Sequence, residues 1–414
     1  MRMRRTMKWL AGVVLALVIG VAPVSPARAD ETCQSPFLPK VTGQEDYIYV
    51  WTLGVPGVAD GNDSIVTVDV NPASGSYGKI VHRAPVHGRH EAHHAGFTDD
   101  RRFLWAGGLD TSQIFVFDVA SNPGQPKLVK TIKTFVKDTG LVGPHTFYAL
   151  PGRMLISALS NAKDNGGKTG LAEYSNDGRF IRTIWMPAEA PYGYDVRVNV
   201  NLNRMLTSSF TGRSNYMRPI GELMQDGEAM KRFGGSVVVW DFHARKPLQV
   251  LEVPGVPLEL RWALLPNHPY AFTATAFGGQ LVLIHQQPDG KWAHKNIAEI
   301  GKNVPVDISI APDDSKIYVN SYGDGTMRIY DVTNPFEGKL VQEVKLGDQA
   351  NMVSTSWDGK RVYATSSLLS RWDKPGDHWL KAFAWEDGKL QPKFTIDFKA
   401  VGRAHIMNFG SKSR

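Results

Sequence analysis

The chain has a single cysteine, Cys33, among its 414 residues. One cysteine excludes an internal disulfide and any zinc or iron–sulfur site made of several cysteines. We expect Cys33 to be a free thiol near the start of the mature chain. The sequence also lacks a glycine-rich phosphate loop at a strand–helix junction and a nucleophile elbow. It therefore gives no indication of a nucleotide-binding enzyme or a serine hydrolase.

Long apolar runs are missing too, apart from one near the N-terminus. This run extends from Trp9 to Val21, about 13 residues, and is too short to span a bilayer. Basic residues precede it, and Ala27-Arg28-Ala29 follows it as an A-x-A cleavage pattern. We therefore predict a cleaved signal peptide at residues 1–29 and export to the periplasm. Export uses the Sec route or, because Arg4-Arg5 resembles a twin-arginine signal, a route taken after folding. The alternative for this segment is a buried N-terminal helix.

The predicted mature chain also lacks a strong excess of positive or negative charge. Residues 1–29 hold five of the 47 Lys and Arg residues and no Asp or Glu, which leaves 42 basic against 40 acidic residues. The high isoelectric point of the whole chain thus comes partly from the predicted signal peptide. A nearly balanced mature chain gives no reason to expect nucleic acid or an anionic membrane surface as a partner. We expect a soluble protein without membrane contact once the signal is removed.

The mature chain contains an internal repeat of roughly 50 residues. Each repeat has a β-rich run that follows a turn, and the seven copies are Tyr47–Leu53, Phe103–Gly107, Met154–Leu159, Met205–Phe210, Ala271–Phe277, Ile317–Ser321 and Val362–Leu368. A second run of β-branched and aromatic residues follows each copy. A third run precedes six of the seven copies and begins near His94, His145, Val196, Leu260, Ile308 and Val353.

The seventh copy of the third run, Ala404–Met407, lies at the C-terminus, whereas the first repeat lacks one. The two ends therefore complete one unit between them. We predict an all-β fold, a seven-bladed β-propeller closed by strands from both termini. It forms a single domain, residues 30–414, with a short insertion at about 212–234 that contains a short helix over one mouth of the ring. The alternative is a β-sandwich with a second β domain, which does not explain the period or the split unit.

Three of the chain's 12 histidines fall within His90-Glu91-Ala92-His93-His94. The third run should be the innermost strand of each blade and line the channel. In three repeats a histidine stands at the start of this third run, namely His94, His145 and His405. In three other repeats a carboxylate stands within about one residue of the same position, namely Asp195, Glu259 and Asp307.

One channel mouth is therefore predicted to collect imidazoles and carboxylates. We expect a metal site made of His93, His94, His145 and His405, since imidazole suits copper, zinc, iron or nickel. Adjacent residues of a regular strand point to opposite faces. His93 and His94 can both be ligands only if the strand is bulged there or begins later. His90-Glu91-x-x-His94 also matches a metalloprotease pattern, but that chemistry needs a helix and β-type repeats flank the match.

Several motifs spread over nearly all of the mature chain carry a resemblance to a known family, namely Val68–Pro72, His82–Pro85, Glu91–Phe97, Gly193–Asp195, Pro257–Arg261, Asp331–Pro335, Asp358–Arg361, Ser366–Lys374 and Ala404-His405. By these motifs the chain resembles the selenium-binding protein / methanethiol oxidase family. Family members that bind selenium use a cysteine shortly before the His82 motif. Here Ser76-Tyr77-Gly78 stands in that place and Cys33 lies too far upstream, so we do not expect selenium to bind by that route.

The resemblance implies a copper-dependent oxidase. Its reaction would convert methanethiol, dioxygen and water to formaldehyde, hydrogen sulfide and hydrogen peroxide. The copper ligands of the family correspond to His93, His94, His145 and His405, the residues that the repeat phase also selects. Three carboxylates would orient imidazoles or take the methyl proton, namely Asp195, Glu259 and Asp307.

Two other functions stay open. A non-catalytic periplasmic propeller would bind a metal or a partner protein at its mouth. A hydrolase would hold zinc in place of copper. The expected small-molecule partners are a thiol and dioxygen, and the sequence does not determine the oligomeric state.

Overall fold

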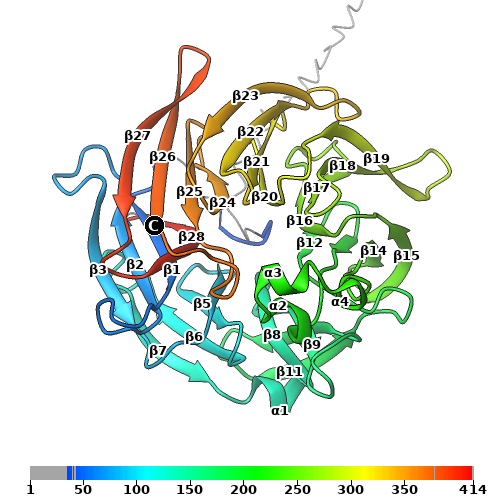
Figure 1. Cartoon of the computed structure of the whole chain (residues 1–414), viewed down its shortest axis with the longest axis horizontal. Helices are drawn as coiled ribbons and strands as arrows, with labels where there is room; N and C mark the ends of the chain where they lie inside the picture. The colour runs from blue at the N-terminus through cyan, green and yellow to red at the C-terminus, as the bar shows by residue number, and fades with distance from the viewer. Residues whose placement is uncertain (1–34, 40, 42, 377, 413–414) are drawn as a thin grey trace, which may run out of the picture.

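Seven antiparallel sheets of four strands each surround a central axis in the computed structural model (Figure 1), counted over the described residues. The structure describes residues 35–412 except 40, 42 and 377. The predicted signal peptide, residues 1–29, and Cys33 lie outside the described residues. The arrangement confirms the predicted seven-bladed β-propeller.

Six blades are built from four consecutive strands each, and the innermost strand comes first along the chain. The first three of these blades are β4 (Ala92–Phe97), β5 (Phe103–Gly108), β6 (Gln113–Asp118) and β7 (Lys127–Ile132); β8 (Leu141–Leu150), β9 (Arg153–Asn161), β10 (Gly170–Ser175) and β11 (Phe180–Trp185); and β12 (Val196–Asn199), β13 (Arg204–Thr207), β14 (Ser236–Asp241) and β15 (Lys246–Glu252).

The next three blades follow the same plan. Their strands are β16 (Pro257–Trp262), β17 (Tyr270–Thr275), β18 (Gln280–Gln286) and β19 (Trp292–Glu299); β20 (Pro305–Ile310), β21 (Lys316–Ser321), β22 (Thr326–Asp331) and β23 (Lys339–Lys345); and β24 (Ala350–Thr355), β25 (Arg361–Ser366), β26 (Trp379–Glu386) and β27 (Lys389–Asp397).

The seventh blade joins the two ends of the chain. Its strand order is β28-β1-β2-β3, in which β28 (Arg403–Gly410) pairs antiparallel with β1 (Tyr47–Leu53), followed by β2 (Ser64–Asp69) and β3 (Lys79–Pro85). The C-terminal strand is thus the innermost strand of the blade that starts the chain. This pairing leaves no open edge between the first and last repeats, and the predicted closure by both termini is confirmed.

Burial follows the position of a strand in its blade. Every residue of β4, β16, β20 and β24 is buried, because both faces of an inner strand are covered by neighbouring blades. The outermost strands β7 and β23 are mostly exposed. The apolar core consequently lies between adjacent blades, as in the cluster that joins β17 and β18 to β20, β21 and β22.

The segment between β13 and β14 lies over the ring (Figure 1). It contains three short helices where the sequence predicted one, α2 (Arg213–Tyr216), α3 (Ile220–Leu223) and α4 (Gly227–Met230). The segment is broken because Pro219 precedes α3 and Asp226 caps α4 by accepting hydrogen bonds from Glu228 N and Ala229 N. A further helix, α1 (Phe135–Thr139), precedes β8. Within the described residues, every helix is too short or too polar to cross a membrane.

Candidate metal centre

A β-bulge places two adjacent histidines in the channel. In the pairing of β4 with β5, Ala92 faces Gly108 and Ala95 faces Ala106, so His93 and His94 together lie opposite a single residue. Such a bulge lets neighbouring side chains leave the strict alternation of a strand. The condition under which both histidines can act as ligands is therefore met.

The same irregularity recurs where other inner strands reach the site. His145 and Thr146 lie within the register shift between β8 and β9, and His405 lies within the shift between β28 and β1. Glu259 and Asn351 occupy the corresponding shifts in β16 and β24. The repeat phase noticed in the sequence thus corresponds to a repeated bulge that turns one or two side chains toward the axis.

The histidines form one cluster. One ligand atom each from His93, His94 and His145 lie within 4.8 Å of one another, and this triad can hold a metal ion. The rings of His94 and His145 have centroids 4.0 Å apart. His405 stands beside the triad, since its ring stacks on that of His93 at 4.0 Å and lies 5.6 Å from that of His94. The structure brings all four predicted histidines together.

Burial keeps these imidazoles neutral. The four side chains are at most 3% exposed. Burial lowers the pKa of His145 and of His405 to about 3. It lowers the pKa of His93 and His94 well below the usual value, and neighbouring imidazoles add to the effect. A neutral imidazole has a free lone pair, which is the form that binds metals.

Unpartnered nitrogen atoms provide the test of whether a metal fits. Among the described residues, no hydrogen-bond partner contacts His93 Nδ1, His145 Nε2 or His405 Nε2, although all three atoms are buried. Buried polar atoms are normally paired. The other nitrogen of His405 lies 2.8 Å from the Ser367 carbonyl, which places the proton on Nδ1 and leaves Nε2 with its lone pair. A bound metal ion would account for these atoms, so the residues fit one.

The three predicted carboxylates form a buried network of ion pairs with two arginines. Arg197 bridges Asp195 (Nε–Oδ2 2.8 Å) and Glu259 (Nη2–Oε2 3.0 Å). Arg261 bridges Glu259 (Nη1–Oε2 3.0 Å) and Asp307 (Nη2–Oδ1 3.0 Å). Burial raises the pKa of Asp195 and of Asp307, and the adjacent guanidinium groups act in the opposite direction.

The carboxylates stand at different distances from the imidazoles. Glu259 Oε1 lies 3.7 Å from His94 Nε2. Asp195 reaches His145 through a hydroxyl, because Thr146 Oγ1 donates to Asp195 Oδ1 at 2.8 Å and lies 3.2 Å from His145 Nδ1. Asp307 instead accepts from Arg261 and from the backbone N–H of Val353. The three predicted groups therefore share one network but differ in their approach to the histidines.

Sequence reasoning missed the groups that complete this network. Arg197 and Arg261 each follow a channel carboxylate by two residues, in Asp195-Val-Arg197 and Glu259-Leu-Arg261. This shared spacing could have indicated from the sequence that the two arginines pair with the channel carboxylates. Asn351, whose Nδ2 lies 3.1 Å from His405 Nδ1, occupies the histidine phase in β24 but offered no comparable pattern.

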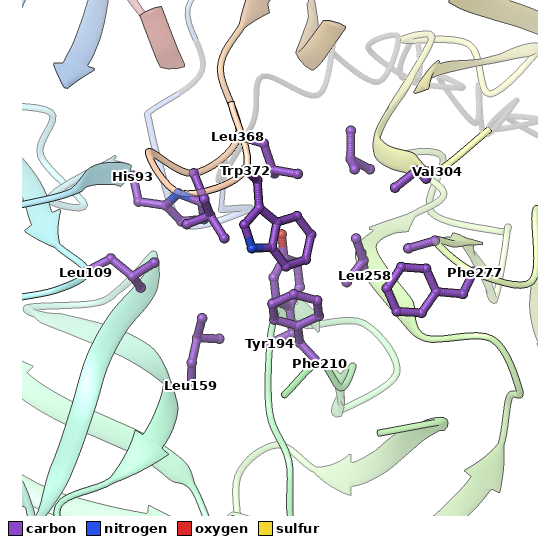
Figure 2. Close-up of a pocket in the computed structure, with 13 residues that line it drawn as sticks. His93, Leu109, Leu159, Tyr194, Phe210, Leu258, Phe277, Val304, Leu368 and Trp372 are labelled. Carbon is purple, nitrogen blue, oxygen red and sulfur yellow. The ribbon is translucent and has the colours of Figure 1, made fainter. Parts of the chain in front are cut away.

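An apolar pocket opens beside the histidines. His93 forms one side, and Leu258, Leu368, Phe210 and Trp372 are among the residues that line the remainder (Figure 2). Most of the lining is aliphatic or aromatic. A small molecule in this pocket would contact an imidazole on one side and carbon on the others.

The sequence comparisons agree with this architecture. The family model described as "56kDa selenium binding protein (SBP56)" matches residues 27–390. The chain belongs to this family. The resemblance noted from the motifs is thereby confirmed.

Two curated relatives are similar over most of their length. The chain is 51% identical to a methanethiol oxidase of Ruegeria pomeroyi, with 94% of each chain covered. It is also 51% identical to a methanethiol oxidase of Hyphomicrobium sp., with 98% of this chain and 96% of the relative covered. Among solved structures, a hypothetical selenium-binding protein from Sulfolobus tokodaii superposes with a TM-score of 0.80 at 26% identity, covering 90% of this chain and 96% of that one.

Proposed function

We propose that this protein is a copper-dependent thiol oxidase. Its reaction converts methanethiol, dioxygen and water to formaldehyde, hydrogen sulfide and hydrogen peroxide. The observation that carries the proposal is the cluster of neutral, buried histidines with unpartnered nitrogen atoms beside an apolar pocket. Two relatives at 51% identity that are named methanethiol oxidase support the choice of substrate.

The metal would be held by His93, His94 and His145, with His405 as a fourth ligand. Copper, when bound, supplies electron exchange between a sulfur ligand and dioxygen, which side chains alone do not provide. Neutral imidazoles suit this ion because each offers a lone pair without competition from a proton at neutral pH.

The surrounding residues have separate tasks in this proposal. The pocket walls, including Leu258 and Leu368, contact the methyl group and exclude bulk water. Asp195 orients His145 through Thr146, and Asp307 holds Arg261 in place. Glu259 Oε1 has no hydrogen-bond partner among the described residues and lies 3.7 Å from His94 Nε2. We assign to Glu259 the role of accepting a proton beside the imidazoles.

The test uses purified protein and its His145→Ala variant. Elemental analysis should find about one copper per wild-type chain. Wild-type protein should consume dioxygen when methanethiol is supplied and should release formaldehyde and sulfide. The variant loses one of four nitrogen ligands, so we expect it to lose most of the bound copper and the activity while the circular dichroism spectrum is unchanged.

Three outcomes separate the candidate functions. Stoichiometric copper with dioxygen uptake supports the oxidase. Tightly bound copper without turnover favours a non-catalytic binding protein and refutes the oxidase. Zinc in place of copper, without dioxygen uptake, favours a hydrolase.

We also propose that the protein acts in the periplasm after removal of residues 1–29, which leaves the propeller as one domain from residue 30 to 414. The basic start, the apolar run and the A-x-A pattern support export. N-terminal sequencing of the protein from a periplasmic fraction should give Asp30 as the first residue. A chain that keeps Met1 and stays in the cytoplasm would refute the proposal.

A further inference from the structure

The loop of residues 367–373, between β25 and β26, contacts two of the histidines. The Ser367 carbonyl lies 2.8 Å from His405 Nδ1 and accepts from Asn351 Nδ2 at 2.5 Å. The Leu368 backbone lies close enough to the His93 imidazole to oppose the lowering of its pKa by burial. Leu368, together with Leu369 and Trp372, also lines the pocket. The position of this loop therefore determines which nitrogen of His405 carries the proton and where one wall of the pocket lies.

The loop has a backbone that needs support. Ser367 has a φ of +111°, a value that residues other than glycine rarely adopt. Strained backbone of this kind persists when its surroundings hold it. Part of that support is internal, since Asp373 accepts hydrogen bonds from Ser367 Oγ (2.7 Å) and Leu368 N (2.8 Å).

The other support comes from the opposite side of the site. Glu91 stands two residues before His93, is 6% exposed and has a φ of +62°. Its Oε1 accepts from the Ser370 N–H at 2.6 Å and its Oε2 accepts from Ser370 Oγ at 2.5 Å. Hydrogen bonds to a buried carboxylate are stronger than those between neutral groups. Glu91 thus joins the segment that carries His93 and His94 to the loop that contacts His93 and His405.

We propose that Glu91 is a positioning residue for the histidine cluster. By holding Ser370 it fixes the 367–373 loop. The fixed loop keeps the Ser367 carbonyl against His405 Nδ1, so that the Nε2 lone pair faces the other imidazoles. Glu91 is neither one of the proposed metal ligands nor among the residues that line the pocket. The inference goes beyond the proposed reaction and depends only on the four-histidine cluster.

The first measurement uses metal-free protein labelled with nitrogen-15. Long-range proton–nitrogen correlation spectra distinguish the two neutral tautomers of histidine, and a His405→Gln variant assigns the signals. Wild-type His405 should appear as a single Nδ1–H tautomer. Glu91→Ala should give a mixture, because Ser370 loses both of its bonds to the carboxylate and the loop is no longer fixed. Glu91→Gln keeps an acceptor for the Ser370 N–H and should restore most of the wild-type signal.

The second measurement is a titration with cobalt(II) alone. Loss of a group that orients a ligand typically weakens metal binding by about 10- to 100-fold, and we expect Glu91→Ala to fall in this range. Glu173→Gln is the matched control, because Glu173 is a fully buried carboxylate held by Arg182 and Arg245 on an outer part of its blade. It should lose stability without altering the His405 signals or the cobalt affinity.

A Glu91→Ala protein with the wild-type tautomer and the wild-type cobalt affinity would overturn the proposal. If this variant does not fold, Ser370→Ala replaces it, because that change removes only the bond from Ser370 Oγ. A shifted His405 signal in Ser370→Ala then supports the proposal and an unchanged one refutes it. Neither measurement uses methanethiol or dioxygen, so a failure of the proposed oxidase activity leaves both results interpretable.

Discussion

Replacing Arg261 with methionine should destabilise the whole propeller. The Arg261 side chain is 1% exposed, and its guanidinium group lies 3.0 Å from both Glu259 and Asp307. The Arg261→Met variant keeps the volume of the side chain but leaves Asp307 without the cation that pairs with it here. Removing one partner of a buried ion pair costs about 3–5 kcal/mol, because the remaining charge stays buried. At an unfolding entropy of about 2.1 cal/mol/K per residue, this cost lowers the Tm of a chain of about 375 described residues by roughly 4–6 °C.

Differential scanning calorimetry of metal-free protein measures this shift. Arg153→Met is the matched control, since Arg153 also pairs with a buried carboxylate, Glu173, at 3.3 Å, but is 47% exposed. Solvent screening limits such a pair to about 0–1 kcal/mol, and Glu173 keeps two other arginines. The control should therefore change the Tm by less than about 2 °C. Equal Tm shifts in the two variants, or an Arg261→Met Tm within 1 °C of wild type, would refute the argument that the buried network of ion pairs stabilises the fold.

The remaining predictions concern pH and the pocket. Burial lowers the folded-state pKa of His145 and His405 to about 3, whereas the unfolded value is about 6.5. The unfolded chain therefore binds more protons between these values, and stability rises with pH across this window and is lost as the pH falls. Each of these two histidines should lower the free energy of unfolding of metal-free protein by about 2 kcal/mol when the pH falls from 7 to 5. Because the pKa values of His93 and His94 are lowered as well, urea unfolding of His145→Asn should show a loss that is about 2 kcal/mol smaller than that of wild type. Equal stability at both pH values in wild type would contradict the argument. Ala276 lines the pocket and is 3% exposed. Ala276→Leu should raise the KM for methanethiol about tenfold without changing the metal content, and an unchanged KM would exclude this pocket as the thiol site.

The strand pattern was predictable wherever burial makes it strong. The predicted run Tyr47–Leu53 coincides with β1. Each of the other six β-rich runs that follow a turn overlaps the second strand of a blade, counted from the axis. The outermost strands were not located, because strands such as β23 are mostly exposed and carry little apolar signal. The helices α2, α3 and α4 have four residues each, too few for a hydrophobic period to develop. They depend on packing, as in the buried cluster that joins Tyr216 to Tyr194.

The sequence by itself determined the number of blades, their closure by Ala404–Met407 and the three histidines, His94, His145 and His405, that share one position in the repeat, because a repeat records the same burial at every period. Tertiary structure decided the rest. A bulge opposite Gly107 turns both His93 and His94 inward, and no local pattern in the sequence marks such a bulge. Arg197, Arg261 and the Glu91–Ser370 contact acquire their meaning from neighbours in other blades. Charges taken out of water need partners, and only the closed ring brings those partners within reach.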